Sequence, residues 1–178
     1  NAASGGRGYN SELFICGDAA LALDGLADRL QGRLQIDPTF LADLKAVREQ
    51  SRTQLIADLG PYSAMVEQLQ GMTGRNFSWV RDVTLSNSIW GNRLLTLFHP
   101  RSGVHALGGG IGQGMPMAIG AAVAAAETDP SRKVFALAGD GGFILNLGEL
   151  ATLVQEKANV VILLMNDQRY GAIRNIPA

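Results

Sequence analysis

The sequence is poor in the residues that mark several protein classes. It contains a single cysteine, Cys16, which cannot form a disulfide within the chain and which we expect to be a small buried hydrophobe in a cytoplasmic protein. Lysine and arginine are scattered singly and the formal net charge is −1, a balance that argues against a nucleic-acid partner. No apolar run reaches the length that crosses a bilayer, so we expect no membrane segment. Neither His99 nor His105 has cysteine or carboxylate neighbours at metal-ligand spacing.

The sequence is rich in glycine. The 178 residues include 22 glycines, which crowd into 103–120 and 139–148. Glycine concentrated in this way predicts loops with unusual backbone angles or a close approach to a ligand. The length and the hydrophobic content of 47% allow one domain with a core and a small appendage.

Short apolar segments alternate with helical patterns from about Leu59 onwards. Short apolar strands separated by helices are typical of a parallel sheet that is covered on both faces. We therefore predict an α/β fold with an open parallel sheet and helices on both faces. The expected strands are 77–83, 133–138 and 159–165, and the expected helices are 64–72, 115–126 and one that begins near 146.

The first part of the chain reads differently. Residues 12–18 predict a short buried strand, and residues 19–30 have apolar residues at helical spacing. One strand and one helix cannot bury their own apolar faces, so we expect this part to be the end of a neighbouring domain. A second helix is predicted to begin with Asp37 as N-cap and Pro38 in its first turn, and it would connect the two parts.

The sequence also predicts the structure of three segments that connect strands and helices in the later part of the chain. Residues 84–90 predict a polar loop, and residues 108–114 predict a glycine loop that leads into a helix. Asn146 is expected to be an N-cap, because Glu149 three residues later completes the pattern of a capping box.

Two acidic segments follow directly on predicted buried strands. They are Gly139-Asp140-Gly141-Gly142 and Asn166-Asp167-Gln168-Arg169, and one βαβ unit joins them. If the two strands are neighbours, they lie about 4.8 Å apart, and Asp140 and Asp167 share the crevice where open α/β sheets bind ligands.

Two carboxylates so close together repel each other unless a cation lies between them. Mg²⁺ prefers oxygen ligands and commonly binds one or two carboxylates together with phosphate oxygens. Gly141 and Gly142 have no side chains, so their N–H groups can approach a phosphate. These residues predict a magnesium-bridged diphosphate site, whereas either aspartate alone would be an ordinary turn residue.

The pattern also resembles a known family. Gly139-Asp140-Gly141, followed after one helix by Asn166-Asp167, is similar to the cofactor signature of thiamine-diphosphate enzymes. The glycine loop at 107–122 resembles the matching segment of the pyruvate decarboxylase and acetohydroxyacid synthase superfamily. The likeness extends over about 57–178, which implies a diphosphate-binding domain at 57–178, a connecting segment at 32–56 and the tail of a central domain at 1–31.

The resemblance implies a role for each site residue. Asp140 and Asp167 match magnesium ligands, with the backbone carbonyl of Arg169 as a third, although the family commonly has asparagine where this chain has Asp167. Ile111 matches the bulky residue that bends the cofactor into a V, and its N–H matches a donor to a ring nitrogen. The remaining cofactor-binding positions are Gly109, Gly110, Gly139, Gly141 and Gly142, of which Gly109 offers its carbonyl to the aminopyrimidine.

The resemblance further implies a longer enzyme. Family members activate the cofactor with a glutamate from another domain, usually on a partner chain, so no catalytic residue is expected here. The expected substrate is a 2-oxo acid, the expected assembly a homodimer or tetramer, and the outcome either decarboxylation or carboligation. The alternative is a module that binds the cofactor without activity in isolation.

Two other nucleotide-binding folds do not fit the sequence. No three glycines in 107–117 satisfy the G-x-G-x-x-G spacing of dinucleotide-binding domains, and no strand of convincing length precedes them. No Gly-Lys-Ser or Gly-Lys-Thr occurs, which excludes a P-loop.

Overall fold

The computed structural model describes residues 12–174, and the predictions made for 1–11 and 175–178 lie outside this range. The chain divides into two compact units, Asn1–Val47 and Arg48–Ala178. No helix in the described part is both long enough and apolar enough to span a membrane.

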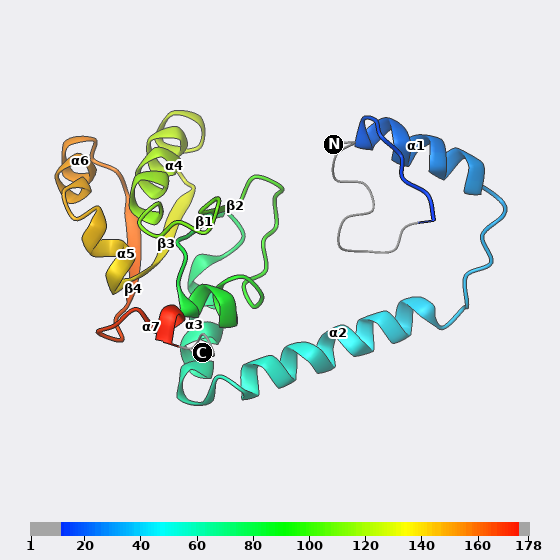
Figure 1. Ribbon diagram of the computed structural model, residues 1–178, viewed down its shortest axis with the longest axis horizontal. Coiled ribbons are helices and arrows are strands. Elements are labelled where there is room, and N and C mark those ends of the chain that lie inside the picture. Colours follow the sequence, from blue (N-terminus) through cyan, green and yellow to red (C-terminus); the bar gives the residue numbers. More distant parts are fainter. Residues whose placement is uncertain (1–11, 175–178) are drawn as a thin grey trace. The chain divides into compact units, whose positions relative to one another are not determined.

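The second unit is built around a parallel sheet. Its strands are β1 (Phe77–Arg81), β2 (Gly103–His105), β3 (Lys133–Gly139) and β4 (Val160–Met165). Every neighbouring pair is parallel and the order across the sheet is β2-β1-β3-β4, as Figure 1 shows. The helical elements are α3 (Ser63–Thr73), α4 (Gly114–Thr128), α5 (Asp140–Leu145), α6 (Glu149–Gln155), α7 (Gly171–Arg174), a 3-10 turn at Gly60–Tyr62 and a π-helical turn at Asn87–Gly91.

One face of the sheet packs against α3 and the π-helical turn. Alternate strand residues point to this face, because side chains along a strand alternate between its two sides. Phe77 and Trp79 of β1 contribute to this core, as do Phe135 and Leu137 of β3. The Nε1–H of Trp79 donates a hydrogen bond of 2.7 Å to the carbonyl of Gly91, which ties the π-helical turn to the strand.

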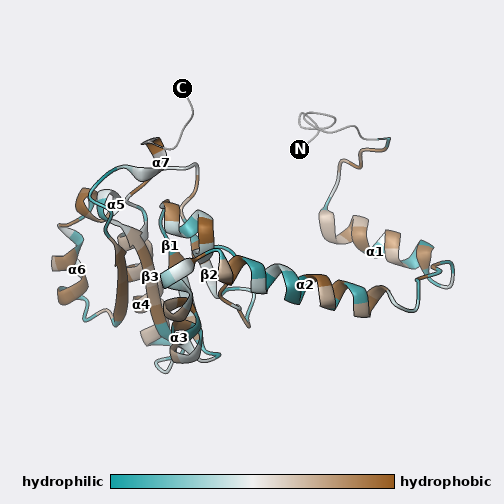
Figure 2. Ribbon diagram, turned by 90° about the horizontal axis from the view of Figure 1, so that it is seen from below, coloured by the Kyte–Doolittle hydropathy of each residue, from teal (hydrophilic) through white to brown (hydrophobic). Residues whose placement is uncertain are grey.

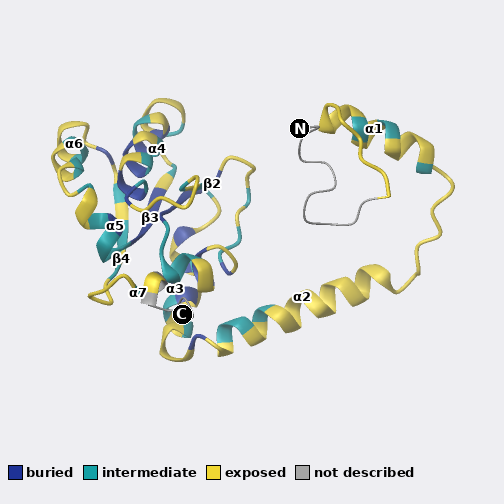
Figure 3. Ribbon diagram, in the orientation of Figure 1, coloured by how far each residue is buried: buried dark blue, intermediate teal, exposed yellow. Residues whose placement is uncertain are grey.

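The opposite face packs against α4 and α6. Val80, Val134 and Ala136 of the strands meet the small residues of α4, including Ala118 and Ala122. Alanine on the inner side of α4 lets the helix approach the sheet closely. Both faces are therefore covered, and the buried residues concentrate in β1, β3 and the inner side of α4 (Figure 3). Figure 2 shows β3 among the hydrophobic, brown elements. The predicted α/β fold is confirmed.

Of the strand and the helix predicted at 12–30, only the helix is confirmed. α1 (Ala19–Leu30) is a helix capped by Asp18, whose side chain accepts a hydrogen bond of 3.0 Å from the N–H of Leu21. The predicted buried strand at 12–18 is wrong: these residues are exposed and unpaired, and Cys16 is exposed. A strand needs a neighbour to satisfy its backbone groups, and the described residues of this unit supply none.

The second helix begins two residues later than predicted, at Phe40 and not at Pro38. α2 spans Phe40–Ala57, and Pro38 and Thr39 form a turn before it. Asp37 still binds a backbone N–H just before the helix, because its side chain accepts a hydrogen bond of 2.8 Å from the N–H of Thr39. That hydrogen bond, with a second from the Thr39 hydroxyl, lowers the pKa of the Asp37 carboxyl.

The polar segment after β1 is helical and not the predicted loop. Arg81 is buried, and its guanidinium donates to the side chains of Asn87 and Asn92 at the two ends of the π-helical turn. Burial lowers the pKa of Arg81. Trp90 lies buried within the same turn. These tertiary contacts fix a helical turn that the polar composition alone does not indicate.

The capping box predicted at Asn146 is also wrong. Asn146 follows the last residue of α5, and α6 begins at Glu149 without a side-chain cap. The Asn146 amide instead donates a hydrogen bond of 2.5 Å to the carbonyl of Gly112 in the glycine loop. A long-range partner has replaced the local one.

Candidate functional site

The carboxyl ends of three strands meet at one edge of the sheet. Gly139, the last residue of β3, lies opposite Met165, the last residue of β4. Asp140 follows the first of these strands, and Asp167 lies two residues beyond the second. β1 runs beside β3 on its other side, so the residues after Arg81 reach the same edge.

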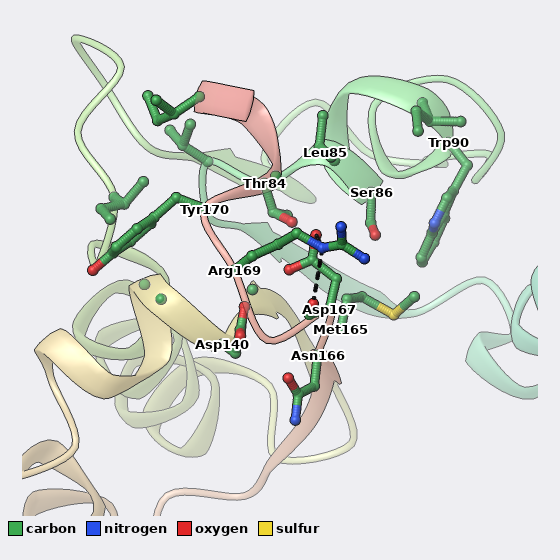
Figure 4. A pocket seen from close by; sticks show the side chains of 18 of the residues that line it. Thr84, Leu85, Ser86, Trp90, Asp140, Met165, Asn166, Asp167, Arg169 and Tyr170 are labelled. Atoms are coloured by element: carbon green, nitrogen blue, oxygen red, sulfur yellow. Dashed lines mark hydrogen bonds and ion pairs between the residues drawn. The ribbon is translucent and has the colours of Figure 1, made fainter. Parts of the chain in front are cut away.

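A cavity of about 440 Å³ opens at this edge. Pockets of this size hold small-molecule ligands in other proteins. Figure 4 shows that Asp140 and Asp167 face the same space, together with residues that follow β1. The lining comes from five parts of the chain: the turn that follows α2, the segment 83–90, the glycine loop, the segment that follows β3 and the segment that follows β4.

All three predicted metal-binding residues line this cavity. Arg169 lies beside Asp167: its Nε donates a hydrogen bond of 3.1 Å to the Asp167 carbonyl and lies 3.9 Å from the carboxylate oxygen Oδ2. Asp167 is 45% exposed and Arg169 53%, so the carboxylate is open to a ligand from the cavity. Within residues 12–174, no three histidine, cysteine, aspartate or glutamate side chains cluster tightly enough to hold a metal ion.

The turn after β4 has an unusual backbone. Gln168 has a φ of +57°, which is uncommon for a residue with a side chain. The Asn166 side chain stabilises the turn by accepting a hydrogen bond of 3.0 Å from the Gln168 N–H. Non-glycine residues in this conformation concentrate at binding sites, where the surrounding structure holds them.

The predicted ring-binding residues lie in the glycine loop. Gly109 and Ile111 line the cavity, and Gly110 does not. Gly109 has a φ of +76°, a conformation that favours glycine. The side chain of Gln113 stabilises the loop, because its amide donates hydrogen bonds to the carbonyls of Leu107 at 2.9 Å and Gly110 at 3.0 Å. The loop thus presents Gly109 and Ile111 to the cavity.

The predicted diphosphate-binding glycines also line the cavity, and each has a close neighbour. A Cβ on Gly139 would lie 3.1 Å from the hydroxyl of Thr84, and one on Gly141 would lie 2.6 Å from the ring of Tyr170. A Cβ on Gly142 would lie 2.6 Å from the Asp82 carboxylate. A side chain at 141 or 142 would therefore have to displace Tyr170 or Asp82.

Some lining residues were not predicted as site residues. Ser86, Trp90 and Tyr170 line the cavity, whereas His99 and His105 do not. Asp82 was missed altogether, although it contacts both the glycine loop and α5. The predicted strand 77–83 placed Asp82 inside the strand, but β1 ends at Arg81. A predicted strand that ended at Arg81 would have placed Asp82 directly after a strand, as Asp140 is placed after β3.

Comparison with known proteins identifies the family of the chain. The family model described as "Thiamine pyrophosphate enzyme, C-terminal TPP binding domain" matches residues 85–177. The chain belongs to this family. The resemblance inferred from the strand-end aspartates and the glycine loop is thereby confirmed, since thiamine pyrophosphate and thiamine diphosphate are the same compound.

Individual relatives of this thiamine pyrophosphate enzyme domain agree. It is 31% identical over 177 residues to acetolactate synthase 1 of Nicotiana tabacum, covering 94% of this chain and 26% of that protein. It is 31% identical over 175 residues to the catabolic acetolactate synthase of Raoultella terrigena, covering 94% of this chain and 30% of that protein. The solved thiamine diphosphate-dependent 4-hydroxybenzoylformate decarboxylase of Rhodococcus jostii superposes with a TM-score of 0.55 at 29% identity, covering 62% of this chain and 20% of that one. The chain thus spans less than a third of the length of these relatives.

Proposed function

We propose that this chain binds thiamine diphosphate through Mg²⁺ and forms part of an enzyme that decarboxylates or carboligates 2-oxo acids. The observation that carries the proposal is the placement of Asp140 and Asp167, which follow adjacent parallel strands and line one cavity. The glycines around Asp140, which are Gly139, Gly141 and Gly142, line the same cavity.

The donor set suits magnesium. Asp140 and Asp167 would supply two carboxylate oxygens, and the backbone carbonyl of Arg169 a third oxygen. Mg²⁺ is six-coordinate and takes its remaining ligands from waters and phosphate oxygens, which fits a site that has no third acidic ligand. Gly141 and Gly142 would then lie beside the diphosphate, because they directly follow Asp140 and line the same cavity.

The other end of the cofactor would lie against the glycine loop. Ile111 is 37% exposed on the cavity side and offers an apolar surface for the cofactor rings. The carbonyl of Gly109 and the N–H of Ile111 would position the aminopyrimidine, with Gly110 between them. When bound, thiamine diphosphate supplies the carbanion stabilisation that breaking or forming a bond at the keto carbon requires.

The whole enzyme is proposed to be a lyase or transferase that works as a dimer or tetramer. The activating glutamate would come from another domain, as the family resemblance implies. The isolated chain would then bind the cofactor without turning over substrate. One relative is named for 4-hydroxybenzoylformate, a 2-oxo acid, and this supports the proposed substrate class. The single cysteine is in keeping with a cytoplasmic location.

A thermal unfolding assay tests the proposal. A ligand that binds only the folded state stabilises it by RT ln(1 + [L]/Kd), about 2.7 kcal/mol at a hundredfold excess over Kd. We expect the midpoint to rise with thiamine diphosphate and Mg²⁺ together, and to rise little with either alone. Thiamine without the diphosphate is the matched control and should have no effect. An equal rise with thiamine would show that the diphosphate site is not used.

A further inference from the structure

Asp82 is a buried acidic side chain that the proposed cofactor contacts do not use. It is 1% exposed and follows β1 at the same sheet edge as Asp140. In the described part of the chain no basic side chain pairs with it. Burying a carboxylate costs free energy unless hydrogen bonds stabilise it, so its partners show what it holds in place.

The partners of the carboxylate are backbone N–H groups. The N–H of Val83 donates to Oδ1 at 2.8 Å. The N–H of Gly112 donates to both oxygens, at 3.1 Å to Oδ1 and 2.9 Å to Oδ2. Hydrogen bonds to an ionised acceptor are stronger than those between neutral groups. Of these two donors, only Gly112 belongs to a distant segment, which is the glycine loop.

Three glycines surround this carboxylate at close range. A Cβ on Gly114 would lie 2.8 Å from the Asp82 Cβ, and one on Gly142 would lie 2.6 Å from Oδ2. Gly112 has a φ of +92° and lies against Asn146, which binds its carbonyl. The Gly112 residue is thus held at its N–H by Asp82 and at its carbonyl by Asn146.

These contacts join the two halves of the proposed site. Gly112 directly follows Ile111, which would contact the cofactor rings, and Gly142 directly follows Gly141, which would contact the diphosphate. We propose that Asp82 is a positioning residue that fixes the distance between the ring-binding loop and the diphosphate-binding segment. The inference rests on the proposed function, because the distance between the two segments matters only if one cofactor contacts both.

The geometry requires a carboxylate and not an amide. Both oxygens of Asp82 face backbone donors: Oδ1 faces Val83 and Gly112, and Oδ2 faces Gly112. In Asp82→Asn, either orientation of the amide places its NH₂ against at least one N–H. One donor then opposes another, the loop loses a hydrogen bond, and the size of the side chain stays the same.

Two ligands separate a positioning role from a general loss of folding. Thiamine diphosphate with Mg²⁺ contacts both halves of the site, whereas inorganic diphosphate with Mg²⁺ contacts only the half at α5. Calorimetric titration of the full chain gives both affinities. We expect Asp82→Asn to lower the affinity for thiamine diphosphate about tenfold relative to that for diphosphate. Hydrogen exchange at the Gly112 amide should also become faster, with or without ligand.

Two further variants complete the experiment. Ser102→Ala removes a buried hydroxyl that accepts a 2.8 Å hydrogen bond from Arg132 at the opposite end of the sheet, so it should cost stability without changing the ratio of affinities. Asn146→Ala frees the Gly112 carbonyl and should lower the ratio to a smaller extent, and it serves as the test if Asp82→Asn does not fold. An unchanged ratio in the Asp82 and Asn146 variants would overturn the inference alone. A wild-type chain that binds neither ligand would overturn the proposed function, and this inference with it.

Discussion

Replacing Gly142 by alanine should destabilise the chain, although alanine favours helices. The added Cβ would lie 2.6 Å from Oδ2 of Asp82 and 3.2 Å from the Gly112 nitrogen, both closer than ordinary van der Waals contact. Asp82 cannot move away without losing hydrogen bonds to a buried charge, which costs about 1.5–3 kcal/mol. The gain in helix propensity from glycine to alanine is about 1 kcal/mol. We therefore expect a net loss of about 0.5–2 kcal/mol in the free energy of unfolding.

Urea unfolding followed by tryptophan fluorescence measures this loss. Both tryptophans of the chain, Trp79 and Trp90, are buried and should report on unfolding of the second unit. Gly120→Ala is the matched control, because Gly120 lies within α4 and a Cβ there would meet nothing within 4 Å. This control should stabilise the chain by up to about 1 kcal/mol.

A double-mutant cycle identifies the cause. In an Asp82→Ala background the carboxylate is gone, and the cost of Gly142→Ala should disappear. The coupling energy between the two substitutions should be about 2 kcal/mol, as for residues in direct contact. A Gly142→Ala variant as stable as the Gly120→Ala control, or a cost that persists without the carboxylate, would refute the packing argument.

Two further predictions concern the core and the pH dependence of stability. Trp79→Phe should lower the free energy of unfolding by about 1–3 kcal/mol in urea unfolding, because the Gly91 carbonyl loses its buried donor. Hydrogen bonds from the side chain of Ser131 and, to a smaller extent, from that of Asn76 lower the pKa of Asp129. The stabilisation that the Asp129 carboxylate provides is therefore present above the ordinary carboxyl pKa and is lost as the pH falls through the lowered pKa. The stability difference between wild type and Asp129→Asn should accordingly be larger at about pH 6 than at about pH 3, and a difference that grows toward acid would contradict this sign.

The sequence predicts the parts of the fold that follow from hydrophobic pattern. β3 and β4 are nearly continuous apolar runs bounded by polar residues, and α4 is a long alanine-rich stretch after a glycine loop. Their order along the chain determines that β3 and β4 are parallel, and it places Asp140 and Asp167 at one edge. This part of the candidate site needs no information beyond the periodicity of the sequence.

The missed features depend on contacts between distant residues. Asn146 has the same local pattern whether its amide caps a helix or reaches Gly112, which lies 34 positions earlier. The helical turn after β1 depends on Arg81 and on the burial of Trp90, and a polar composition does not reveal either. Asp82 was hidden because an apolar residue, Val83, follows it and made the strand look longer than it is.

The most direct test of the account is calorimetric titration of thiamine diphosphate into the chain, first with Mg²⁺ and then with EDTA, for wild type and Asp140→Ala. Asp140 is partly buried in the cavity lining and begins α5, so its loss should remove a metal ligand while the sheet is retained. We expect the wild type to bind the cofactor only with Mg²⁺, and we expect the variant not to bind it. Binding that persists in EDTA or in Asp140→Ala, or no heat at millimolar cofactor, would contradict it.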